Sequence, residues 1–313
     1  MKTVFLGTSV FALPVLEALF LNGHELAAVI TQPDRPCGRG LRISPSAVKS
    51  KAEELGIPVW QPVRVNAPDF LTMIQDVVEP EVLIVAAYGQ ILRKKLLSIP
   101  RRGCINVHAS LLPAYRGADP IRWTLLRGEQ KTGVTIMLMD EGVDTGPILS
   151  ARELLVNEMD NAETLTSRLG QLGSGLLIET LAGMEQGEIT PRTQDNEKAS
   201  YAPPMTRQMV QIDWRLSARE IVNQIRAFSP CPGAYGILNG KRIHILRASV
   251  GISKSTWEPG TVIGIEKEQG ILVATGEGMV TVTQLKPENR KALHFRDFCC
   301  GYRLAPGAGF SVE

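Results

Sequence analysis

An asparagine and a histidine, Asn106 and His108, stand two residues apart at the end of a short apolar run, residues 104–108. Side chains alternate between the two faces of a strand, so this spacing predicts that both project from the same face. In open α/β sheets, ligands bind beyond the carboxyl ends of the strands. Pro113 and Gly117 follow and favour an irregular loop. The segment is therefore either a ligand-binding strand end or a capped strand with a satisfied histidine.

A second polar segment, M-D-E-G-V-D-T-G-P-I at 139–148, follows another predicted strand and offers two carboxylates. Gly142 and Gly146 allow a tight loop that could aim Asp140 or Asp144 into the same crevice. A carboxylate beside His108 would orient the imidazole ring and fix its tautomer. The alternative is an Asp-Gly hairpin with both acids in solvent.

Together these segments supply a carboxamide, an imidazole and a carboxylate, but no activated nucleophile. Ser110 lacks an elbow motif, and Cys104 lacks an activating neighbour. A carboxamide donor can stabilise a developing oxyanion, and a histidine can move a proton. The set suits acyl transfer by direct attack of an incoming amine. A dinucleotide site is disfavoured, because the turn at 7–9 is not G-x-G-x-x-G and no ribose-binding acid follows the second predicted strand.

The segment 31–49 is rich in Pro, Gly and Arg and is longer than a typical connection between a strand and a helix. Arg35, Arg39 and Arg42 could meet phosphates. We expect this loop to lack regular structure and to be mobile until a ligand binds. The alternative is a solvated surface loop without a ligand.

Strands and helices alternate along the first part of the chain, which indicates a Rossmann-like, doubly wound, mostly parallel sheet. The predicted strands are 2–6, 25–31, 57–60, 82–87, 104–108, 134–139 and 148–155. The predicted helices are 11–22, 47–55, 69–78 and 163–184. The first strand and helix could imitate a signal peptide, but Pro14 and Glu17 interrupt the apolar stretch and favour a core strand.

The composition and periodicity of the sequence change after residue 187. Residues 188–208 are polar and proline-bearing without periodicity, and are predicted to be a linker. Beyond them one helical stretch, 218–228, precedes several short β-like runs, at 234–238, 242–250, 260–265, 271–274 and 280–285. We therefore expect a catalytic domain over 1–187 and an OB-like β-barrel over 209–313, with a sandwich as the alternative to the barrel.

Composition and charge narrow the class of protein. The chain has 313 residues, of which 44% are hydrophobic and 21% charged, and this excludes disordered and fibrous classes. No apolar run approaches the roughly 20 residues of a membrane span, so a cytoplasmic protein is expected. Residues 206–313 carry 14 Lys/Arg against 9 Asp/Glu, a net +5, which either faces a polyanion or has no ligand. Five cysteines without C-x-x-C spacing predict packing thiols and no metal site.

Several blocks resemble the methionyl-tRNA formyltransferases, a branch of the family that uses 10-formyltetrahydrofolate. The blocks are T-Q-P-D-R-P-C-G-R-G (31–40), V-A-A-Y-G-Q-I-L (85–92), I-N-V-H-A-S-L-L-P-A-Y-R-G (105–117), M-D-E-G-V-D-T-G (139–146), I-D-W (212–214) and I-R-A-F-S-P-C-P (225–232). The 105–117 and 139–146 blocks indicate the wider family, whose members also act on glycinamide ribonucleotide or amino sugars. The arginine-bearing loop and the second domain narrow the resemblance to the tRNA enzymes.

The resemblance implies roles for individual residues. Asn106, His108 and Asp144 would form the catalytic trio. The residues implied to bind the folate are Tyr88, Gly89, Ile91, Ser110, Leu111, Leu112 and Pro113. Arg35, Arg39 and Arg42 would contact the tRNA, and the linker and basic C-terminal domain would hold its acceptor arm.

The same resemblance implies formyl transfer from 10-formyltetrahydrofolate, the cosubstrate, to the free amine of initiator methionyl-tRNA, by a monomer and without a metal. Two alternatives remain open at this point. One is a formyltransferase acting on a small amine such as an amino sugar, and the other is a non-catalytic RNA-binding protein.

Overall fold

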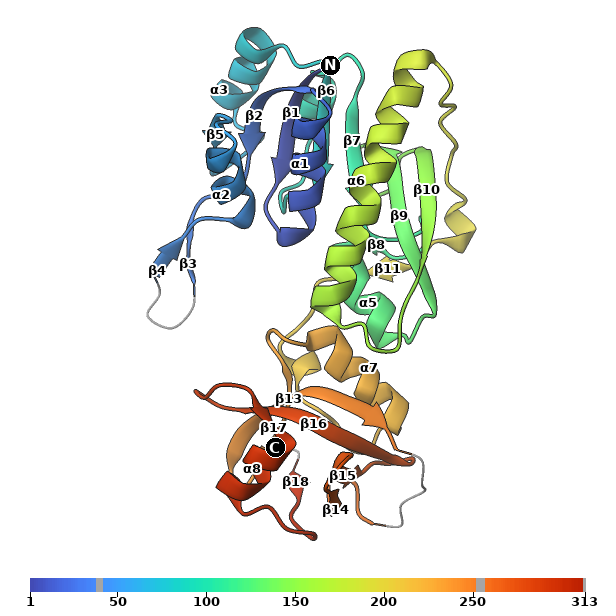
Figure 1. The fold of residues 1–313 in the computed structure, drawn as a ribbon. Helices are drawn as coiled ribbons and strands as arrows, with labels where there is room; N and C mark the ends of the chain where they lie inside the picture. Colours follow the sequence, from blue (N-terminus) through green and yellow to red (C-terminus); the bar gives the residue numbers. More distant parts are fainter. Residues whose placement is uncertain (38–41, 252–256, 312–313) are drawn as a thin grey trace. The chain divides into compact units, whose positions relative to one another are not determined.

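The computed structural model describes residues 1–37, 42–251 and 257–311, except for the side chains of Cys37 and Arg42 (Figure 1). The chain divides into two compact units, each interrupted in sequence. The first contains residues 1–120, 131–155 and 166–203, and the second contains 121–130, 156–165 and the chain from 204 onward. The boundaries expected at 187 and 208 remain predictions.

A seven-stranded sheet forms the centre of the first unit, in the order β10-β9-β7-β6-β1-β2-β5. The strands are β1 (Lys2–Gly7), β2 (Glu25–Ile30), β5 (Val59–Trp60), β6 (Val82–Ala86), β7 (Cys104–His108), β9 (Lys131–Leu138) and β10 (Ile148–Leu155). Five neighbouring strands from β7 to β5 are parallel, and β9 runs antiparallel to both β7 and β10. Every residue of β6 is buried, as expected for a strand covered on both faces. The predicted mostly parallel α/β sheet is confirmed.

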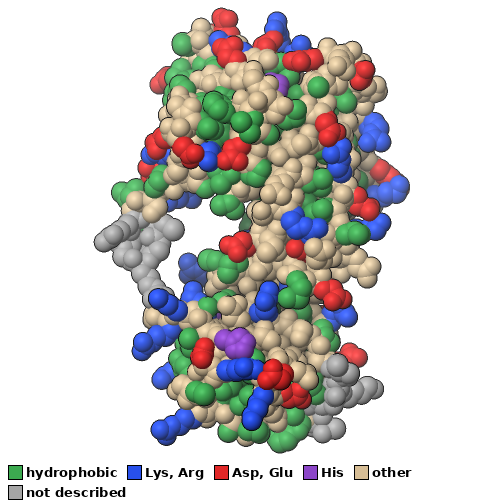
Figure 2. All heavy atoms as spheres, viewed as in Figure 1, with side chains coloured by type: hydrophobic (Ala, Val, Ile, Leu, Met, Phe, Trp, Pro, Cys, Tyr) green, Lys and Arg blue, Asp and Glu red, His purple; other side chains and the backbone are tan. Residues whose placement is uncertain are grey.

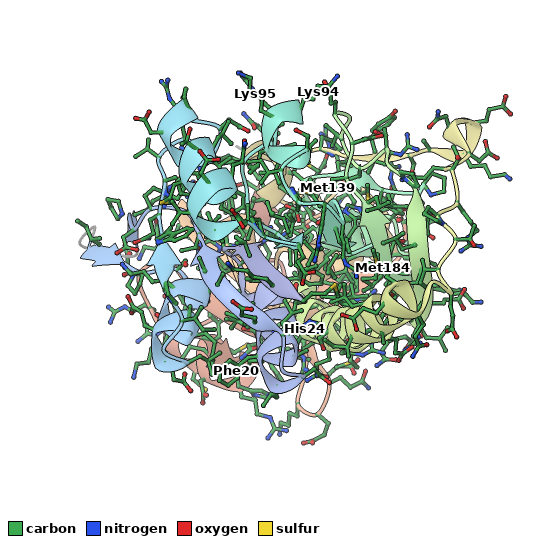
Figure 3. All side chains as sticks on the ribbon, turned by 90° about the horizontal axis from the view of Figure 1, so that it is seen from above. Phe20, His24, Lys94, Lys95, Met139 and Met184 are labelled. Atoms are coloured by element: carbon green, nitrogen blue, oxygen red, sulfur yellow. The ribbon has the colours of Figure 1, made fainter. Side chains whose placement is uncertain are left out.

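Helices cover both faces of this sheet. They are α1 (Leu13–Leu21), α2 (Ala47–Glu54), α3 (Pro68–Thr72) with a π-helical continuation over Met73–Val78, α4 (Lys94–Leu97) and α6 (Ala162–Gln186). The view in Figure 3 has Lys94 and Lys95 of α4 on one side of the sheet and Phe20 of α1 and Met184 of α6 on the other. At Gly173 of α6, a Cβ would lie 2.9 Å from Val107 Cγ1. Because Val107 alternates with Asn106 and His108, α6 covers the face of β7 opposite to them.

The second unit is built on a curled antiparallel sheet, in the order β14-β15-β16-β13-β12-β18, with β17 paired to β16. The strands are β12 (Ala234–Leu238), β13 (Lys241–Val250), β14 (Val262–Glu266), β15 (Gly270–Ala274), β16 (Met279–Pro287), β17 (Leu293–His294) and β18 (Phe310–Ser311). Val262 N donates to Ala308 O at 2.7 Å and Phe310 N to Gly260 O at 2.8 Å, so the two ends of the sheet are joined. The prediction of an OB-like β-barrel is confirmed in its curled antiparallel sheet.

Helices of the second unit include α5 (Pro120–Leu126), which starts at the last residue before the unit boundary, α7 (Ala218–Phe228) and α8 (Phe295–Tyr302). A capping box starts α7, in which the Ser217 hydroxyl accepts from Glu220 N and the Glu220 carboxylate accepts from Ser217 N. Fully buried Trp214 lies 5.1 Å from Phe310 between ring centroids and contributes to the core.

The expectation that 31–49 lacks regular structure is wrong for part of the loop. Strands β3 (Arg35–Cys37) and β4 (Arg42–Ser44) pair antiparallel, with Pro36 opposite Ile43. Pairing satisfies backbone groups that a free loop would leave to water, and a two-stranded ribbon has edges that tolerate proline. Arg39 lies outside the described residues.

The segment expected to be a linker also contains ordered structure. Strand β11 (Tyr201–Ala202) pairs in parallel with β8 (Arg116–Gly117), and a 3-10 turn covers Asn196–Lys198. The chain here follows a fixed path against the loop after β7. Within the described ranges, no helix has both the length and the apolar character to cross a membrane.

Candidate active site

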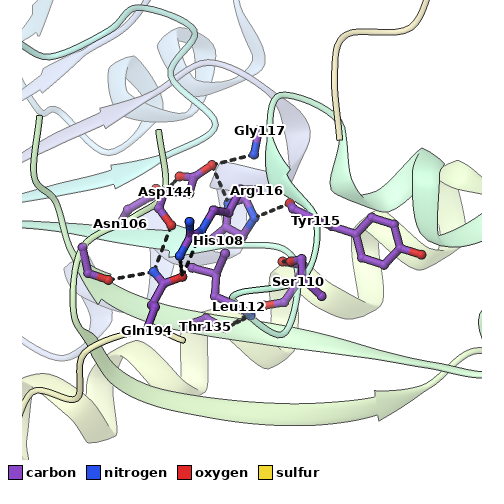
Figure 4. Close-up of polar contacts among 12 residues, drawn as sticks. Asn106, His108, Ser110, Leu112, Tyr115, Arg116, Gly117, Thr135, Asp144 and Gln194 are labelled. Carbon is purple, nitrogen blue, oxygen red and sulfur yellow. Dashed lines mark hydrogen bonds and ion pairs between the residues drawn. The ribbon is translucent and has the colours of Figure 1, made fainter. Parts of the chain in front are cut away.

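Asn106, His108 and Asp144 meet at the carboxyl end of β7 (Figure 4). Asn106 Nδ2 donates to Asp144 Oδ1 at 3.2 Å, and His108 Nδ1 lies 3.6 Å from Asp144 Oδ2. Asn106 and His108 are buried, and the Asp144 side chain is 14% exposed. The three side chains predicted to act together therefore lie in contact at the strand end.

The hydrogen bonds of His108 indicate its tautomer. Nε2 lies 3.0 Å from the carbonyl oxygen of Tyr115, which can only accept, so Nε2 carries a proton. In the neutral ring Nδ1 is then the basic atom, and it faces Asp144. A carboxylate at this position stabilises the imidazolium that forms when Nδ1 takes a proton.

The two candidate carboxylates of the 139–148 segment have different roles. Asp140 Oδ1 accepts from Gly142 N at 3.0 Å and from Thr145 Oγ1 at 2.6 Å, so it closes the loop on itself. Asp144 has φ 54°, and its Oδ2 accepts from Gly117 N at 2.8 Å. A Cβ at Gly146 would lie 1.9 Å from Leu138 O, so the loop requires glycine there. Of the two acids, Asp144 faces Asn106 and His108.

Ser110 holds the loop after β7. Its hydroxyl donates to Ala114 O at 2.6 Å, and its side chain is fully buried. Thr135 Oγ1 on β9 donates to Ser110 O at 2.7 Å and accepts from Leu112 N at 3.0 Å. Leu112 is buried, and Leu111 and Pro113 are partly exposed. These hydrogen bonds fix the path of the chain beyond His108.

The predicted folate residues after β6 differ in exposure. Tyr88 is buried, and its hydroxyl has no hydrogen-bond partner among the described residues. Burial raises the pKa of Tyr88, so the hydroxyl stays protonated. Gly89 has φ 93°, a conformation that suits glycine, whereas Ile91 is 73% exposed.

Two of the predicted tRNA-binding arginines, Arg35 and Arg42, belong to the paired strands β3 and β4. Arg35 is exposed, and its Nη2 donates to Gln32 Oε1 at 3.2 Å. The backbone of Arg42 belongs to β4. The contact of Arg35 is thus within its own loop, and it does not join the Asn106, His108 and Asp144 set.

A cavity of about 490 Å³ borders the Asp140 loop. Its lining residues are Lys94, Leu97, Ser98, Met139, Asp140, Glu141 and Gly142. Lys94 Nζ lies 3.3 Å from Glu141 Oε1 across this region, and Figure 3 labels Lys94 and Met139. The lining does not include Asn106, His108 or Asp144, so we assign no reaction to this cavity.

Comparisons with known proteins agree with the resemblance. The formyl transferase model matches residues 1–181, and the model of the formyl transferase C-terminal domain matches 204–303. The chain belongs to the formyl transferase family. The methionyl-tRNA formyltransferase of Citrifermentans bemidjiense is 44% identical over 307 residues, which cover 98% of this chain and 95% of the relative. That of Bacillus subtilis is 43% identical, covering 100% and 98%.

Solved structures share the formyl transferase fold at lower identity. HypX from Aquifex aeolicus in complex with tetrahydrofolic acid has a TM-score of 0.67 and 16% identity, covering 100% of this chain and 51% of HypX. WlaRD, a sugar 3N-formyl transferase, has a TM-score of 0.66 and 21% identity, covering 93% and 99%. At these identities the likeness concerns the fold alone.

Sequence reasoning missed two residues of this site, Gln194 and Arg116. Gln194 lies in the segment interpreted as a linker, and its Nε2 donates to Asp144 O at 2.9 Å and to Gly146 O at 2.7 Å. The Arg116 guanidinium donates to Gln194 Oε1. A single glutamine in a polar stretch gives no periodic or motif signal. Arg116 belongs to the 105–117 block, but no residue pattern in that block predicts that its side chain is buried.

The cysteine prediction is wrong in part. Cys104 is buried, and burial raises the pKa of its thiol to about 12, so it is an inert packing residue. Cys231 and Cys300 are exposed and do not pack in a core. Among the cysteines whose side chains are described, none forms a disulfide.

Proposed function

We propose that this chain transfers the formyl group of 10-formyltetrahydrofolate to the free α-amine of initiator methionyl-tRNA, giving N-formylmethionyl-tRNA in the cytoplasm. The observation that carries the proposal is the similarity to methionyl-tRNA formyltransferases over nearly the whole chain, the C-terminal unit included. The contacts among Asn106, His108 and Asp144 supply groups suited to this reaction.

The proposed mechanism begins with attack of the amine nitrogen on the formyl carbon, which makes a C–N bond and a tetrahedral oxyanion. Asn106 Nδ2 has two hydrogens and donates one to Asp144, which leaves the other for the formyl oxygen. A donor held in advance stabilises the charge without reorganisation as it develops. Asp144 thus orients the carboxamide as well as the imidazole.

Proton transfer completes the reaction. His108 Nδ1 takes the proton that the amine loses on forming the new bond, and Asp144 stabilises the resulting imidazolium. The bond between the formyl carbon and the folate N10 then breaks, and N10 gains a proton. Each amine proton lost is matched by one gained at N10. No covalent enzyme intermediate is required.

Binding residues complete the proposal. For the folate we propose the segment with Tyr88, Gly89 and Ile91 and the loop 110–113, because both follow neighbouring parallel strands, β6 and β7, at the same end of the sheet. For the tRNA we propose Arg35, Arg39 and Arg42. Arg39 and the side chain of Arg42 lie outside the part of the chain that the structure describes.

The C-terminal unit is proposed to attract the RNA. Figure 2 shows several Lys and Arg side chains, interspersed with hydrophobic and some acidic ones, on the face that this unit presents in that view. On β12 and β13, Arg242 Cζ lies 4.2 Å from the centroid of the Tyr235 ring, and His244 packs edge-on against the same ring at 5.8 Å. Register places Lys286 of β16 beside His244. Cations interleaved with aromatic rings are typical of surfaces that bind nucleic acids.

The direct test is formylation of methionyl-tRNA by the purified chain with 10-formyltetrahydrofolate. We expect rapid formylation of initiator methionyl-tRNA and slow formylation of an elongator methionyl-tRNA. Unacylated tRNA is the control. Formylation of an amino sugar nucleotide without any tRNA requirement would favour the small-amine alternative. RNA binding without turnover would favour a non-catalytic protein.

A further inference from the structure

The amide of Gln194 holds the backbone on both sides of Thr145. Its Nε2 donates to Asp144 O at 2.9 Å and to Gly146 O at 2.7 Å, so both amide hydrogens are used within one loop. Gln194 is 6% exposed. The loop that carries Asp144 is therefore tied to a residue 50 positions later in the chain.

Arg116 fixes which way this amide points. Its Nε and Nη2 donate to Gln194 Oε1 at 3.1 and 2.7 Å, and Nη2 also donates to Asn196 Oδ1 at 2.9 Å. A guanidinium has donors only, so the amide oxygen must face Arg116 and the NH₂ group must face the two carbonyls. The amide orientation follows from this network, which Figure 4 shows beside His108.

The network connects the two loops that carry His108 and Asp144. Arg116 follows Tyr115, whose carbonyl accepts from His108 Nε2, and precedes Gly117, whose N–H donates to Asp144 Oδ2 at 2.8 Å. Asp144 has φ 54°, a left-handed conformation that is uncommon outside glycine and that contacts with its surroundings must hold in place. Pinning its carbonyl and that of Gly146 supplies such a constraint.

We propose that Gln194 is a positioning residue that sets the direction of the Asp144 carboxylate through these two carbonyl contacts. The inference rests on the proposed function, because it assigns Asp144 to the reaction. The side chain of Gln194 contacts only the backbone carbonyl of Asp144. Gln194 therefore acts through Asp144 and is not itself catalytic. A displacement of about 1 Å in a reacting group can cost on the order of 100-fold in rate.

Gln194→Glu is the discriminating variant. The carboxylate has the same size and can keep the contact with Arg116, but it cannot donate to the two carbonyls and places an oxygen against them. We expect kcat for initiator methionyl-tRNA to fall by about 10- to 100-fold. KM for the folate and for the tRNA should stay within about threefold, because this side chain is buried and its amide group is already hydrogen-bonded within the protein. Gln194→Met, neutral and of similar size, should give the same division between kcat and KM.

The chain contains a matched control in the second unit. Gln224 Nε2 donates to Met209 O at 2.8 Å and Gln211 O at 2.9 Å, and the residue is 8% exposed. Gln224→Glu removes the same kind of clamp far along the chain from the site. We expect it to lower the melting temperature and leave kcat unchanged. A comparable loss of kcat in both variants would attribute the Gln194 effect to general destabilisation and overturn the inference.

The second test measures whether the effects of the Gln194 and Asp144 substitutions on kcat are coupled. If Gln194 acts through Asp144, then Gln194→Glu should have little further effect on kcat in an Asp144→Ala background. Multiplicative losses in the double variant would overturn the inference. An inactive wild-type chain would instead contradict the proposed function. An active wild type with a fully active Gln194→Glu variant would contradict this inference alone.

Discussion

The two units of the chain use polar side chains in opposite ways. In the first, Asn106, His108 and Asp144 are mostly buried, with a hydrogen bond from Asn106 to Asp144 and His108 Nδ1 3.6 Å from the same carboxylate. In the second, most of the cations are exposed, among them Lys241 and Arg247 of β13. A fixed network suits bond making, in which small displacements are costly, whereas exposed cations suit attraction of a polyanion. Substitutions should therefore change kcat in the first unit and salt-dependent binding in the second.

The largest effect is expected from the trio itself. Asn106→Ala, His108→Ala and Asp144→Ala should each lower kcat by about 100-fold or more, because each removes a group placed where charge or protons move. Folate and tRNA affinities should change much less. Steady-state kinetics of formylation, with binding measured separately, provide the test. If Asn106→Ala kept near wild-type kcat, its oxyanion role would be wrong, and a loss confined to KM would make it a binding residue.

A smaller effect, with the opposite signature, is expected on the second unit. Lys241→Ala, Arg247→Ala and Lys286→Ala combined should weaken tRNA binding and flatten its salt dependence. Each lost phosphate contact should reduce the slope of log K against log salt by about 0.7 to 0.9. Titrations of tRNA across a salt series, alongside folate titrations, measure both quantities. Folate affinity and kcat at saturating tRNA should be unchanged.

Charge variants are a cleaner test here than deletion of the C-terminal part. Arg226 of α7 donates to Asp160 O and Asn157 O, both at 2.7 Å, and these acceptors belong to the same unit although they precede α6. A cut near residue 205 would divide this unit. Lys131→Ala, at an exposed position paired with Glu153, controls for loss of charge in the first unit. An unchanged salt slope in the triple variant would refute the electrostatic role.

Asp140 and Asp144 lie in one loop and allow a structural carboxylate to be compared with a carboxylate of the proposed catalytic trio. Asp140→Ala removes acceptors for Gly142 N and Thr145 Oγ1 and should destabilise the fold by about 1 kcal/mol per lost hydrogen bond. Its kcat should fall less than tenfold, because Asp140 does not contact Asn106 or His108. Urea unfolding and kinetics on the same preparation test this. An Asp140→Ala loss as large as that of Asp144→Ala would show that the whole loop, rather than Asp144, is required.

The periodicity of apolar residues, together with the tendency of ligands to bind at strand ends, predicted much of this fold and site. The apolar run at 104–108 and the 218–228 and 234–238 segments are elements with those bounds, because burial on one or both faces fixes their period. The pairing of Asn106 with His108 followed from the twofold repeat of a strand. The choice between Asp140 and Asp144 did not, because it depends on a left-handed turn. The helices at 94–97 and 120–126 were missed, since they are short and weakly periodic.

Long-range polar contacts were beyond the same reasoning. Residues 188–208 are polar, and polarity alone predicts a solvated linker. In the structure, Ser200 Oγ accepts from Tyr115 N at 2.9 Å, and Ser200 O accepts from Arg116 N at 2.8 Å. Polar residues in this segment thus supply hydrogen-bond partners to backbone N–H groups of a loop far away in the sequence. Only tertiary structure distinguishes this use of polarity from contact with water.

The smallest expected effect concerns Tyr88, a predicted folate residue whose hydroxyl has no partner among the described residues. Burial of that hydroxyl carries a desolvation cost that Tyr88→Phe removes while keeping the ring, so the variant should be more stable by about 1 kcal/mol. For a unit of this size that corresponds to a rise of about 2–4 °C in melting temperature.

Tyr235→Phe is the matched control for Tyr88→Phe, because the Tyr235 hydroxyl donates to Gln211 Oε1 at 3.3 Å and its removal should not stabilise the chain. Calorimetry of both variants, with and without tetrahydrofolate, separates packing from binding. If the Tyr88 ring alone contributes to the folate site, KM for the folate should stay within about twofold of wild type. A rise in KM together with a lower melting temperature of the folate-bound Tyr88→Phe protein would contradict this. The orphaned hydroxyl would then be a folate ligand, and the first unit would keep one buried polar group unpaired for its cosubstrate.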